Sequence, residues 1–404
     1  MTEPWLTIIG IGGNGLQSLT SPQLAHLQQA QVLVVGERLE NSIRGAIPHV
    51  TRILTWGAGF RPTLDEILKL RGSPVTVLAT GDPMHFGIGA TLRRYVEAGE
   101  MRVLPSPSAF SLAAARLGWP LQAVAQISLH GRPVSHLNRH VLPGARILAL
   151  TSDAQTVRDV ATALVKRGFG ASILHVLEHM GGEAERVLHH TAEELLALTI
   201  ELSDFNTLAI DCASDGPLLS PIPGLPDDAF RHDGQLTKRE VRAVTLAQLS
   251  PFPNALLWDV GAGCGSIAIE WLRTGMGTRA IAIEPKPERV AMMRDNADTL
   301  GVADLEIVAA EAPEGLTGLE PPDVIFIGGG VTTDGLFAAC WQALKPGGRL
   351  VTNAVTLEGE AVLVTLRSQH GGEMSRISVS RAAPVGRFCG WKSLMPVTMW
   401  SVVK

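Results

Sequence analysis

Acidic residues flank a glycine-rich segment in the second half of the chain. Asp259 lies near the end of an apolar stretch, residues 256–260, and glycines at alternate positions follow within 261–265. Glycine has no Cβ, so a ligand can approach the backbone closely there. Glu284 closes the next apolar stretch, where a carboxylate that binds a ribose hydroxyl is expected. The residue types and their spacing therefore predict a site for an adenosyl compound.

The form of the glycine segment favours S-adenosylmethionine (SAM) over a dinucleotide. A dinucleotide site places a pyrophosphate on a GxGxxG loop, whereas this segment reads GxGxG with an acid two residues ahead of it. SAM has no phosphate and carries a sulfonium cation, which suits a loop flanked by acids. A strand–helix turn without a ligand is the alternative, and the position of the second acid argues against it.

Alternating strands and helices are expected to position this loop. The apolar spacing of residues 266–273 predicts a helix directly after it. Two strands at the C-terminus, joined by a long loop, predict an antiparallel pair, which is typical of a seven-stranded, Rossmann-like SAM methyltransferase sheet and not of a purely parallel dinucleotide fold. The predicted strands are residues 256–260, 280–283, 305–308, 323–327, 349–354, 376–380 and 397–403.

A linker is predicted between the two halves of the chain. Residues 213–235 are rich in proline, glycine and aspartate and show no helical or strand period. This places one domain at 1–212 and a second at 236–404. Thr237, with Glu240 three residues later, predicts a capping box at the start of an amphipathic helix.

The first half contains a second glycine-rich segment. Residues 10–15 match GxGxxG, and Glu37 follows the predicted strand 32–35, a pattern that alone would indicate an NAD site. However, Ser21 and Pro22 are typical of a helix start, as N-cap and first helical residue. The glycines therefore do not open the helix that follows, and the dinucleotide interpretation is disfavoured.

Two further turns in the first half follow predicted strands. Strand 75–79 leads into a Gly-Asp-Pro turn at residues 81–83, which presents backbone groups and one carboxylate at a sheet edge. Strand 102–104 leads into the segment 105–109 and then a helix. Three more α/β units follow, around residues 146–151, 172–178 and 206–212.

These segments together resemble the tetrapyrrole (corrin/porphyrin) methylase family, and within it the precorrin-6Y methyltransferase branch. The motifs IIGIGGNG, VLVVGERLEN, VLATGDPMHFGIG, PSPSAFSLAAARLG and SLHGR carry the resemblance over residues 5–212. It implies two α/β subdomains with SAM folded in a cleft between them and the first glycine loop on the tetrapyrrole side. The family usually has Pro-Gly-Val-Ser-Ser at 105–109, so only the serine at 108 is carried over. The implied SAM contacts are Gly81, Asp82, Pro83 and Ser108.

The second half resembles the decarboxylating partner of that branch over residues 233–404. The motifs TKREVRA, LLWDVGAGCGSIAIE, AIAIEPKPERV, AEAPEGL and PDVIFIGGG carry this resemblance. The implied SAM-lining residues are Thr237, Gly261, Ala262, Gly263, Cys264, Gly265, Glu284, Glu311 and Ala312. Position 311 is usually aspartate. Position 264 is commonly serine, and the cysteine has no basic neighbour in sequence, so we interpret it as a small loop residue and not a nucleophile.

The two resemblances imply a bifunctional enzyme of cobalamin biosynthesis with two SAM sites per chain. Such an enzyme methylates precorrin-6B at carbon 5 with its first half and at carbon 15 with its second. It also removes carbon dioxide from the ring-C acetate to give precorrin-8x. Relatives of both halves assemble into oligomers, so a homo-oligomer is expected. No residue is assigned as a general acid or base.

A precorrin carries several carboxylates, so basic side chains are candidates for binding it. Solvated surface charges are the alternative for each. The candidates are His130 and Arg132 in the first half and Lys238, Arg239 and Arg242 in the second. His175 and His179 are four residues apart on a predicted strand, too far apart for a shared metal, so we interpret them as structural and expect no metal site.

Composition restricts the other possibilities. The chain has 404 residues, enough for about two to three domains, with a formal net charge of −5 and 5% aromatic residues. This argues against an RNA-modifying methyltransferase, which would need a basic stripe with interleaved aromatics. A non-catalytic SAM-responsive regulator or scaffold is a second alternative, disfavoured because both glycine loops are intact. Four cysteines without a CxxC pair, no long apolar run and no signal-like N-terminus predict a cytoplasmic enzyme.

Overall fold

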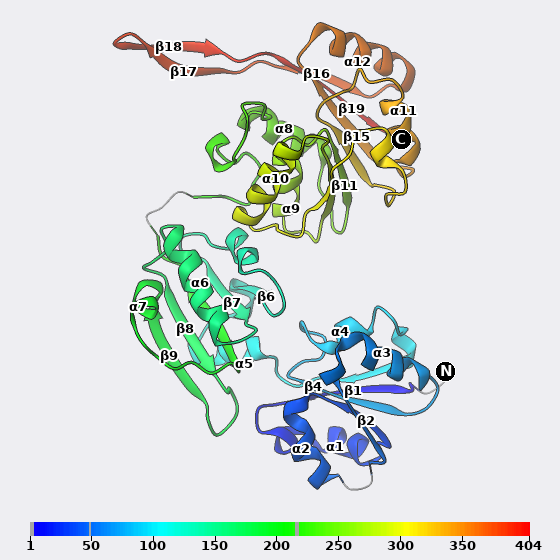
Figure 1. The fold of residues 1–404 in the computed structure, drawn as a ribbon, viewed down its shortest axis with the longest axis vertical. Coiled ribbons are helices and arrows are strands. Elements are labelled where there is room, and N and C mark those ends of the chain that lie inside the picture. The colour runs from blue at the N-terminus through cyan, green and yellow to red at the C-terminus, as the bar shows by residue number, and fades with distance from the viewer. Residues whose placement is uncertain (1–3, 48–49, 215–217) are drawn as a thin grey trace. The chain divides into compact units, whose positions relative to one another are not determined.

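The computed structural model describes residues 4–47, 50–214 and 218–404, which form two compact units (Figure 1). The N-terminal unit comprises Met1–Val134 and His140–Gly216, and the C-terminal unit comprises Ser135–Arg139 and Pro217–Lys404. Each unit contains its own sheets and its own hydrophobic core.

The first sheet of the N-terminal unit is parallel, with strand order β3-β2-β4-β1-β5. Side chains of β1 alternate between its two faces: Leu6 and Ile8 enter one apolar cluster, and Ile9 and Ile11 the other. Helices α3 and α4 contribute to the first cluster and α1 and α2 to the second. The bounds are β1 Leu6–Ile11, α1 Ser21–Gln28, β2 Val32–Val35, α2 Glu37–Ala46, β3 Arg52–Thr55, α3 Phe60–Lys69, β4 Val75–Thr80, α4 Ile88–Leu92 and β5 Met101–Leu104.

The second sheet of this unit is mixed, with strand order β6-β7-β10-β8-β9. Only β6 and β7 pair in parallel. Helix α5 packs on the sheet through Phe110 and Ala113, against Leu148 and Leu177. The edge strands β6 and β9 were not among the predicted strands. The bounds are α5 Ala109–Leu117, β6 Ala125–Ser128, β7 Arg146–Leu150, α6 Ala154–Lys166, β8 Ile173–Glu178, β9 Arg186–Thr191, α7 Ala192–Ala197 and β10 Asn206–Asp211.

The C-terminal unit is built on a seven-stranded sheet of order β13-β12-β11-β14-β15-β19-β16. Five strands are parallel, and β19 and β16 are antiparallel to their neighbours, which confirms the predicted terminal pair. The bounds are α8 Arg239–Leu249, β11 Leu256–Val260, α9 Ser266–Arg273, β12 Arg279–Ile283, α10 Pro287–Thr299, β13 Glu306–Val308, β14 Val324–Ile327, α11 Leu336–Ala343, β15 Arg349–Ala354, α12 Leu357–His370, β16 Glu373–Ile377 and β19 Val397–Val403.

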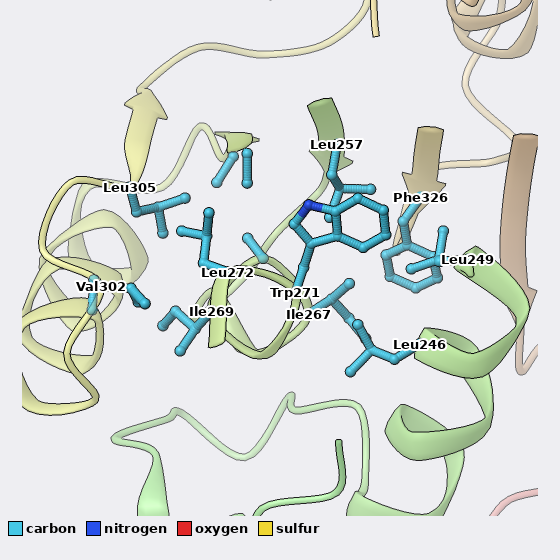
Figure 2. Packing of buried hydrophobic residues seen from close by; sticks show 14 of the residues in the cluster. Leu246, Leu249, Leu257, Ile267, Ile269, Trp271, Leu272, Val302, Leu305 and Phe326 are labelled. Carbon is cyan, nitrogen blue, oxygen red and sulfur yellow. The ribbon is translucent and has the colours of Figure 1, made fainter. Parts of the chain in front are cut away.

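Apolar clusters cover both faces of this sheet. On one face Trp271 of α9 is fully buried among Leu246 and Leu249 of α8 and Leu257 of β11 (Figure 2). The indole N–H of Trp271 donates to the Arg279 carbonyl at 3.0 Å, so its single polar group is satisfied. Helices α11 and α12 contribute to the cluster on the other face. The sheet is thereby held rigid behind the loops that follow its strands.

The structure differs from the sequence prediction at three local features. The long loop predicted between the last two strands contains a β-hairpin, β17 Ser380–Val385 and β18 Phe388–Ser393, which projects from the unit (Figure 1). Helix α1 has Thr20 and not Ser21 as its N-cap. Helix α8 has Lys238 as its N-cap, one residue after Thr237, so the predicted capping box does not form.

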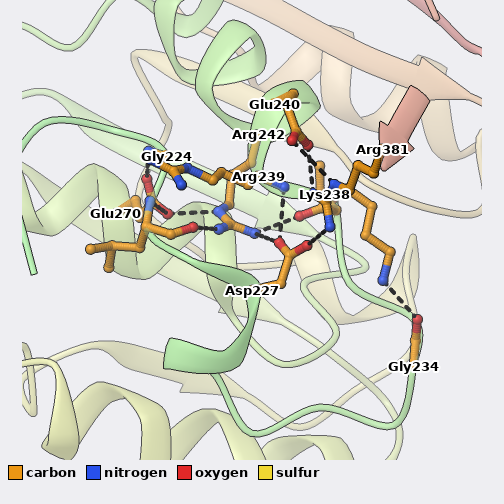
Figure 3. A network of polar contacts seen from close by, with 11 residues as sticks. Gly224, Asp227, Gly234, Lys238, Arg239, Glu240, Arg242, Glu270 and Arg381 are labelled. Carbon is orange, nitrogen blue, oxygen red and sulfur yellow. Dashed lines mark hydrogen bonds and ion pairs between the residues drawn. The ribbon is translucent and has the colours of Figure 1, made fainter. Parts of the chain in front are cut away.

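The C-terminal part of the predicted linker is packed and not free. Leu225 and Phe230 are buried in the core of the C-terminal unit. Arg242 of α8 is fully buried beside them and donates to Glu270 of α9 at 2.6 Å and to the backbone carbonyl of Leu225 (Figure 3). Asp227 joins this network through Arg242 and through Arg381 of the hairpin. One ion cluster therefore ties the linker, two helices and the hairpin together.

We expect Arg242→Met to lower the free energy of unfolding by about 3–5 kcal/mol, because it leaves the buried Glu270 carboxylate without its cation. Denaturant titration followed by tryptophan fluorescence measures this change. The control is Arg231→Met, which breaks the exposed pair with Asp295 and should cost less than about 1 kcal/mol. Equal losses in the two variants would contradict the assignment.

Candidate functional site

A cavity of about 970 Å³ lies at the carboxyl ends of the parallel strands of the C-terminal unit. Ligands of open α/β sheets bind at this edge. The glycine loop between β11 and α9 lines the cavity with Gly261 and Gly263, at φ 71° and 60°. Gly265 closes the loop at φ 83°, and a Cβ there would lie 2.5 Å from a side-chain carbon of Met293. The loop can therefore follow this path only with glycine.

Asp259 presents a buried carboxylate to this cavity. One oxygen accepts the Ala268 N–H at 3.0 Å, and the other, Oδ1, has no partner among the described residues. Burial raises the pKa of Asp259 to about 7, and the charge of Glu284 adds to the rise, while the Ala268 N–H opposes it. A buried acid with an unsatisfied oxygen is costly unless a donor or cation meets it. The cavity is thus suited to a positively charged ligand.

Glu284 holds the glycine loop and also faces the cavity. Its Oε2 accepts the Gly263 N–H at 2.8 Å, and its Oε1 accepts the Lys286 N–H at 3.1 Å. Each carboxylate oxygen has two lone pairs, so both retain capacity for a ligand hydroxyl. The side chain is 3% exposed and therefore fixed in place.

Most of the residues predicted to bind SAM in this half line the same cavity. They are Thr237, Gly261, Ala262, Gly263, Cys264, Glu284, Glu311 and Ala312. Gly265 shapes the loop without lining the cavity. Burial raises the pKa of the Cys264 thiol to about 11, so the thiol stays protonated at neutral pH, as expected of a residue that is not a nucleophile.

The basic residues predicted to bind substrate in this half separate into three groups. Lys238 lines the cavity. Arg239 is exposed and lies outside the lining. Arg242 corrects the prediction: its guanidinium has no exposed surface and is satisfied by Glu270, Asp227 and backbone carbonyls. Arg242 is therefore neither a substrate contact nor the solvated surface charge that was the alternative, because helix α8 turns it inward.

A second cavity, of about 910 Å³, lies in the N-terminal unit and is lined by residues that follow strands of both its sheets. Gly81, at φ 69°, and Asp82 enter from the turn after β4. Ser108 enters as the N-cap of α5, and its Oγ accepts the Ser111 N–H at 3.1 Å. Five of the residues predicted for this half therefore line the cavity: Gly81, Asp82, Ser108, His130 and Arg132. Pro83 is buried outside the lining.

The first glycine loop is part of this second cavity and leads into a short 3-10 helix, Gly15–Ser18, and not into an α-helix. Gly12 and Gly13 line the cavity, and α1 begins only at Ser21. A Cβ on Gly13 would lie 2.5 Å from the Met180 carbonyl oxygen, in the turn after β8. The loop therefore packs against a segment of the second sheet.

Several lining residues were not identified from the sequence. His179 was interpreted as structural, and it does hydrogen-bond Ser203 Oγ through Nε2 at 2.8 Å, yet it also lines the second cavity at φ 49°. Phe86, Arg94 and Asp204 line it too. Phe86 lies within the motif VLATGDPMHFGIG but was not assigned a contact. His179, Arg94 and Asp204 lie outside the quoted motifs, and the packing of the two sheets brings them to one cavity. Asp259 was recognised as an acid flanking the loop but was not assigned as a ligand contact.

Within 4–47, 50–214 and 218–404, no group of three or more His, Cys, Asp or Glu side chains is arranged to hold a metal ion. In the same ranges, no helix has the length and apolar character required to cross a membrane.

Comparison with known proteins identifies relatives of both halves. Residues 6–196 match the family Tetrapyrrole (Corrin/Porphyrin) Methylases, and residues 228–404 match the Precorrin methyltransferase domain. A precorrin-6Y C(5,15)-methyltransferase (decarboxylating) from a Sinorhizobium species is 46% identical, covering 100% of this chain and 97% of the relative. One from Mycobacterium tuberculosis (strain ATCC 25618 / H37Rv) is 37% identical, covering 99% and 100%. The crystal structure of the C-terminal domain of precorrin-6Y C5,15-methyltransferase from Rhodobacter capsulatus is 44% identical, covering 46% of this chain and 100% of that chain, with TM-score 0.44.

We expect Asp259→Asn to stabilise the ligand-free protein increasingly as pH rises. The pKa of Asp259 is about 7 in the folded protein and 3.8 as the ordinary value, so the folded state binds the proton more tightly. The resulting stability is present below about pH 4 and is lost as pH rises through 7. The total loss is about 4 kcal/mol for this shift. The variant lacks this loss, so its advantage over wild type should be smallest below about pH 4, grow between pH 4 and pH 7 and be largest above pH 7. Thermal unfolding at several pH values measures it, with the exposed Asp298→Asn as a control that stays within about 0.5 kcal/mol. A pH-independent difference for Asp259→Asn would contradict the assignment.

Proposed function

The chain belongs to the precorrin-6Y C(5,15)-methyltransferase (decarboxylating) family, and from this premise we propose that each unit performs one SAM-dependent methyl transfer to the same precorrin. The N-terminal unit methylates carbon 5. The C-terminal unit methylates carbon 15 and decarboxylates the ring-C acetate. The observation that carries this proposal is the presence of two separate cavities, each lined by the motif residues of its own half.

The cavity of the C-terminal unit fits SAM in shape and in charge. Gly263 leaves the space next to its backbone open, Gly261 lets the backbone of Gly329 approach closely, and Glu284 is fixed where it can accept ribose hydroxyls. The unpartnered Oδ1 of Asp259 supplies the negative charge that the cationic ligand requires. Glu311 and Ala312, beyond β13, complete the lining.

The cavity of the N-terminal unit offers a similar set of groups on a different scaffold. Asp82 has one oxygen bound to the Met84 N–H at 2.8 Å, and its second oxygen has no partner among the described residues. A Cβ on Gly81 would lie 3.5 Å from the Ser108 Cα, so the two turns are adjacent. These groups support a SAM site formed by Gly81, Asp82 and Ser108. With the other cavity, this gives two SAM sites per chain.

SAM, when bound, supplies an activated methyl group whose transfer releases a neutral thioether. What remains for the protein is to position the two reactants and to exclude water, effects worth about 7–11 kcal/mol for well-oriented partners. In the C-terminal unit, Glu284 and the glycine loop fix the donor side. Lys238 and Lys286 line the same cavity and suit a carboxylate-bearing substrate.

The projecting hairpin supports a homo-oligomeric assembly. Its two strands pair only with each other, and Phe388 and Trp391 are 68% and 80% exposed. An isolated two-stranded hairpin is at best marginally stable in water, and exposed apolar groups of this size mark interaction surfaces. We assign the partner that covers the hairpin as a second copy of the chain.

The four cysteines are free, which suits a cytoplasmic location.

We predict two binding events per chain when S-adenosylhomocysteine is titrated by calorimetry. Glu284→Gln should weaken one event and reduce carbon-15 methylation at least about tenfold, because it removes a charge-assisted hydrogen bond. Carbon-5 methylation should stay at the wild-type rate. Glu288→Gln, at an exposed position outside the cavity, is the matched control and should change neither reaction more than twofold. A single binding event, or loss of carbon-5 methylation in Glu284→Gln, would overturn the proposal.

We predict that Phe388→Asp combined with Trp391→Asp lowers the mass of the assembly. Charges on this surface would oppose burial of the hairpin against a second copy, and sedimentation velocity measures the result. Leu357→Asp, at a position also 80% exposed but on α12, is the control and should leave the mass unchanged. A wild-type protein that sediments as a monomer would refute the assembly.

A further inference from the structure

We propose that Arg94 anchors a peripheral carboxylate of the tetrapyrrole in the N-terminal cavity and is a substrate-specificity residue for carbon-5 methylation. This inference rests on the function proposed above, which assigns that cavity to the tetrapyrrole. The family motifs within residues 5–212 did not identify Arg94. Arg94 lines the cavity, has no acidic partner among the described residues and shares the lining with apolar side chains.

The position of Arg94 follows from the helical segment around α4. Gly87, Ala90, Thr91 and Arg94 all line the cavity, and their spacing places them on one face of a helix. The preceding residue, Arg93, is on another side. It donates to the Val96 carbonyl at 3.2 Å, lies 3.7 Å from Glu97 and does not line the cavity. Of two adjacent arginines, one is therefore directed to the cavity side.

Arg94 has no ion-pair partner in the part of the chain that the structure describes. Neither Arg94 nor Arg132 is paired with an acid among the described residues, and Arg132 comes from the other sheet of the unit. The two acids of the lining form no ion pair with either arginine among the described residues: Asp82 accepts the Met84 N–H with one oxygen only, and Asp204 accepts the Ala154 N–H at 3.0 Å. Planar guanidinium groups bind carboxylates through paired hydrogen bonds. Two such groups from two walls match a ring with several carboxylates.

Apolar side chains in the lining of the same cavity suit the face of a macrocycle. Met84 and Phe86 also line the cavity, and each is 46% exposed. Phe86 holds a backbone φ of 55°, which is unfavourable for a non-glycine residue. Its ring is supported by Phe110 at 5.8 Å, edge to face, and by His85 at 5.6 Å. A strained residue that presents an aromatic ring to a cavity is typical of a ligand-binding position.

The test compares Arg94→Gln with Arg93→Gln in the full-length enzyme, with SAM saturating and the tetrapyrrole varied. We expect Arg94→Gln to raise KM for carbon-5 methylation at least tenfold with kcat within twofold of wild type. Arg94→Lys should recover part of the loss, since it restores the charge but not the paired hydrogen bonds. Arg93→Gln should stay within twofold of wild type.

Two further measurements separate the possible outcomes. Carbon-15 methylation in the same samples reports the C-terminal unit and should be unchanged in every variant, and thermal unfolding checks that the N-terminal unit stays folded. S-adenosylhomocysteine affinity distinguishes the tetrapyrrole from the carboxylate of SAM: weakened affinity in Arg94→Gln would assign Arg94 to SAM and overturn the inference. An unchanged KM would also overturn it, whereas a wild-type enzyme without carbon-5 activity would refute the proposed function itself.

Discussion

The buried pair between Arg242 and Glu270 is the interaction on which the C-terminal unit depends most. Glu270 belongs to α9, the helix that begins directly after the glycine loop. Its carboxylate also accepts the backbone N–H groups of Gly224 and Leu225, so the pair fastens the segment before α8 to the helix behind the cavity. Taking two charges out of water is costly, and hydrogen bonds from each guanidinium nitrogen of Arg242 and to both carboxylate oxygens of Glu270 offset that cost. The helix that follows the glycine loop, α9, is thus held by the Arg242–Glu270 cluster within an otherwise apolar layer of helices.

The two cavities present similar groups, a glycine turn and a carboxylate, on two different folds. Each lies where chains leave the carboxyl ends of parallel strands, and each is bordered by glycine at positive φ and by a carboxylate with one free oxygen. In the C-terminal unit the acid belongs to the strand itself, as Asp259. In the N-terminal unit it belongs to the turn after the strand, as Asp82. The shared chemistry therefore follows from the edge of a parallel sheet and not from a common fold.

Much of this architecture could be predicted from the sequence, where local patterns determine the structure. Strand β11 and helix α9 have the predicted bounds, because a buried apolar run and a glycine turn leave few alternatives. Prediction failed where tertiary packing decides. The apolar and charged spacing of α8 did not show that Arg242 would be turned inward to meet Glu270 on another helix. The hairpin was missed although Gly386, at φ 61° in a two-residue turn, is a typical hairpin signal, since the flanking prolines and glycines hide the strand period. Arg94 and His179 reach their cavity only through the packing of two sheets.

The base of the projecting hairpin has a second role. Val379, Leu394 and Met395, at its two ends, line the cavity of the C-terminal unit. The wall of a reaction chamber is therefore continuous with the surface assigned to a second copy. If a neighbouring copy restrained the hairpin, the restraint would extend to that wall of the cavity. The geometry of the cavity would then depend on the concentration of the protein, which determines how much of it is assembled. An enzyme built in this way would respond to its own abundance without any separate effector.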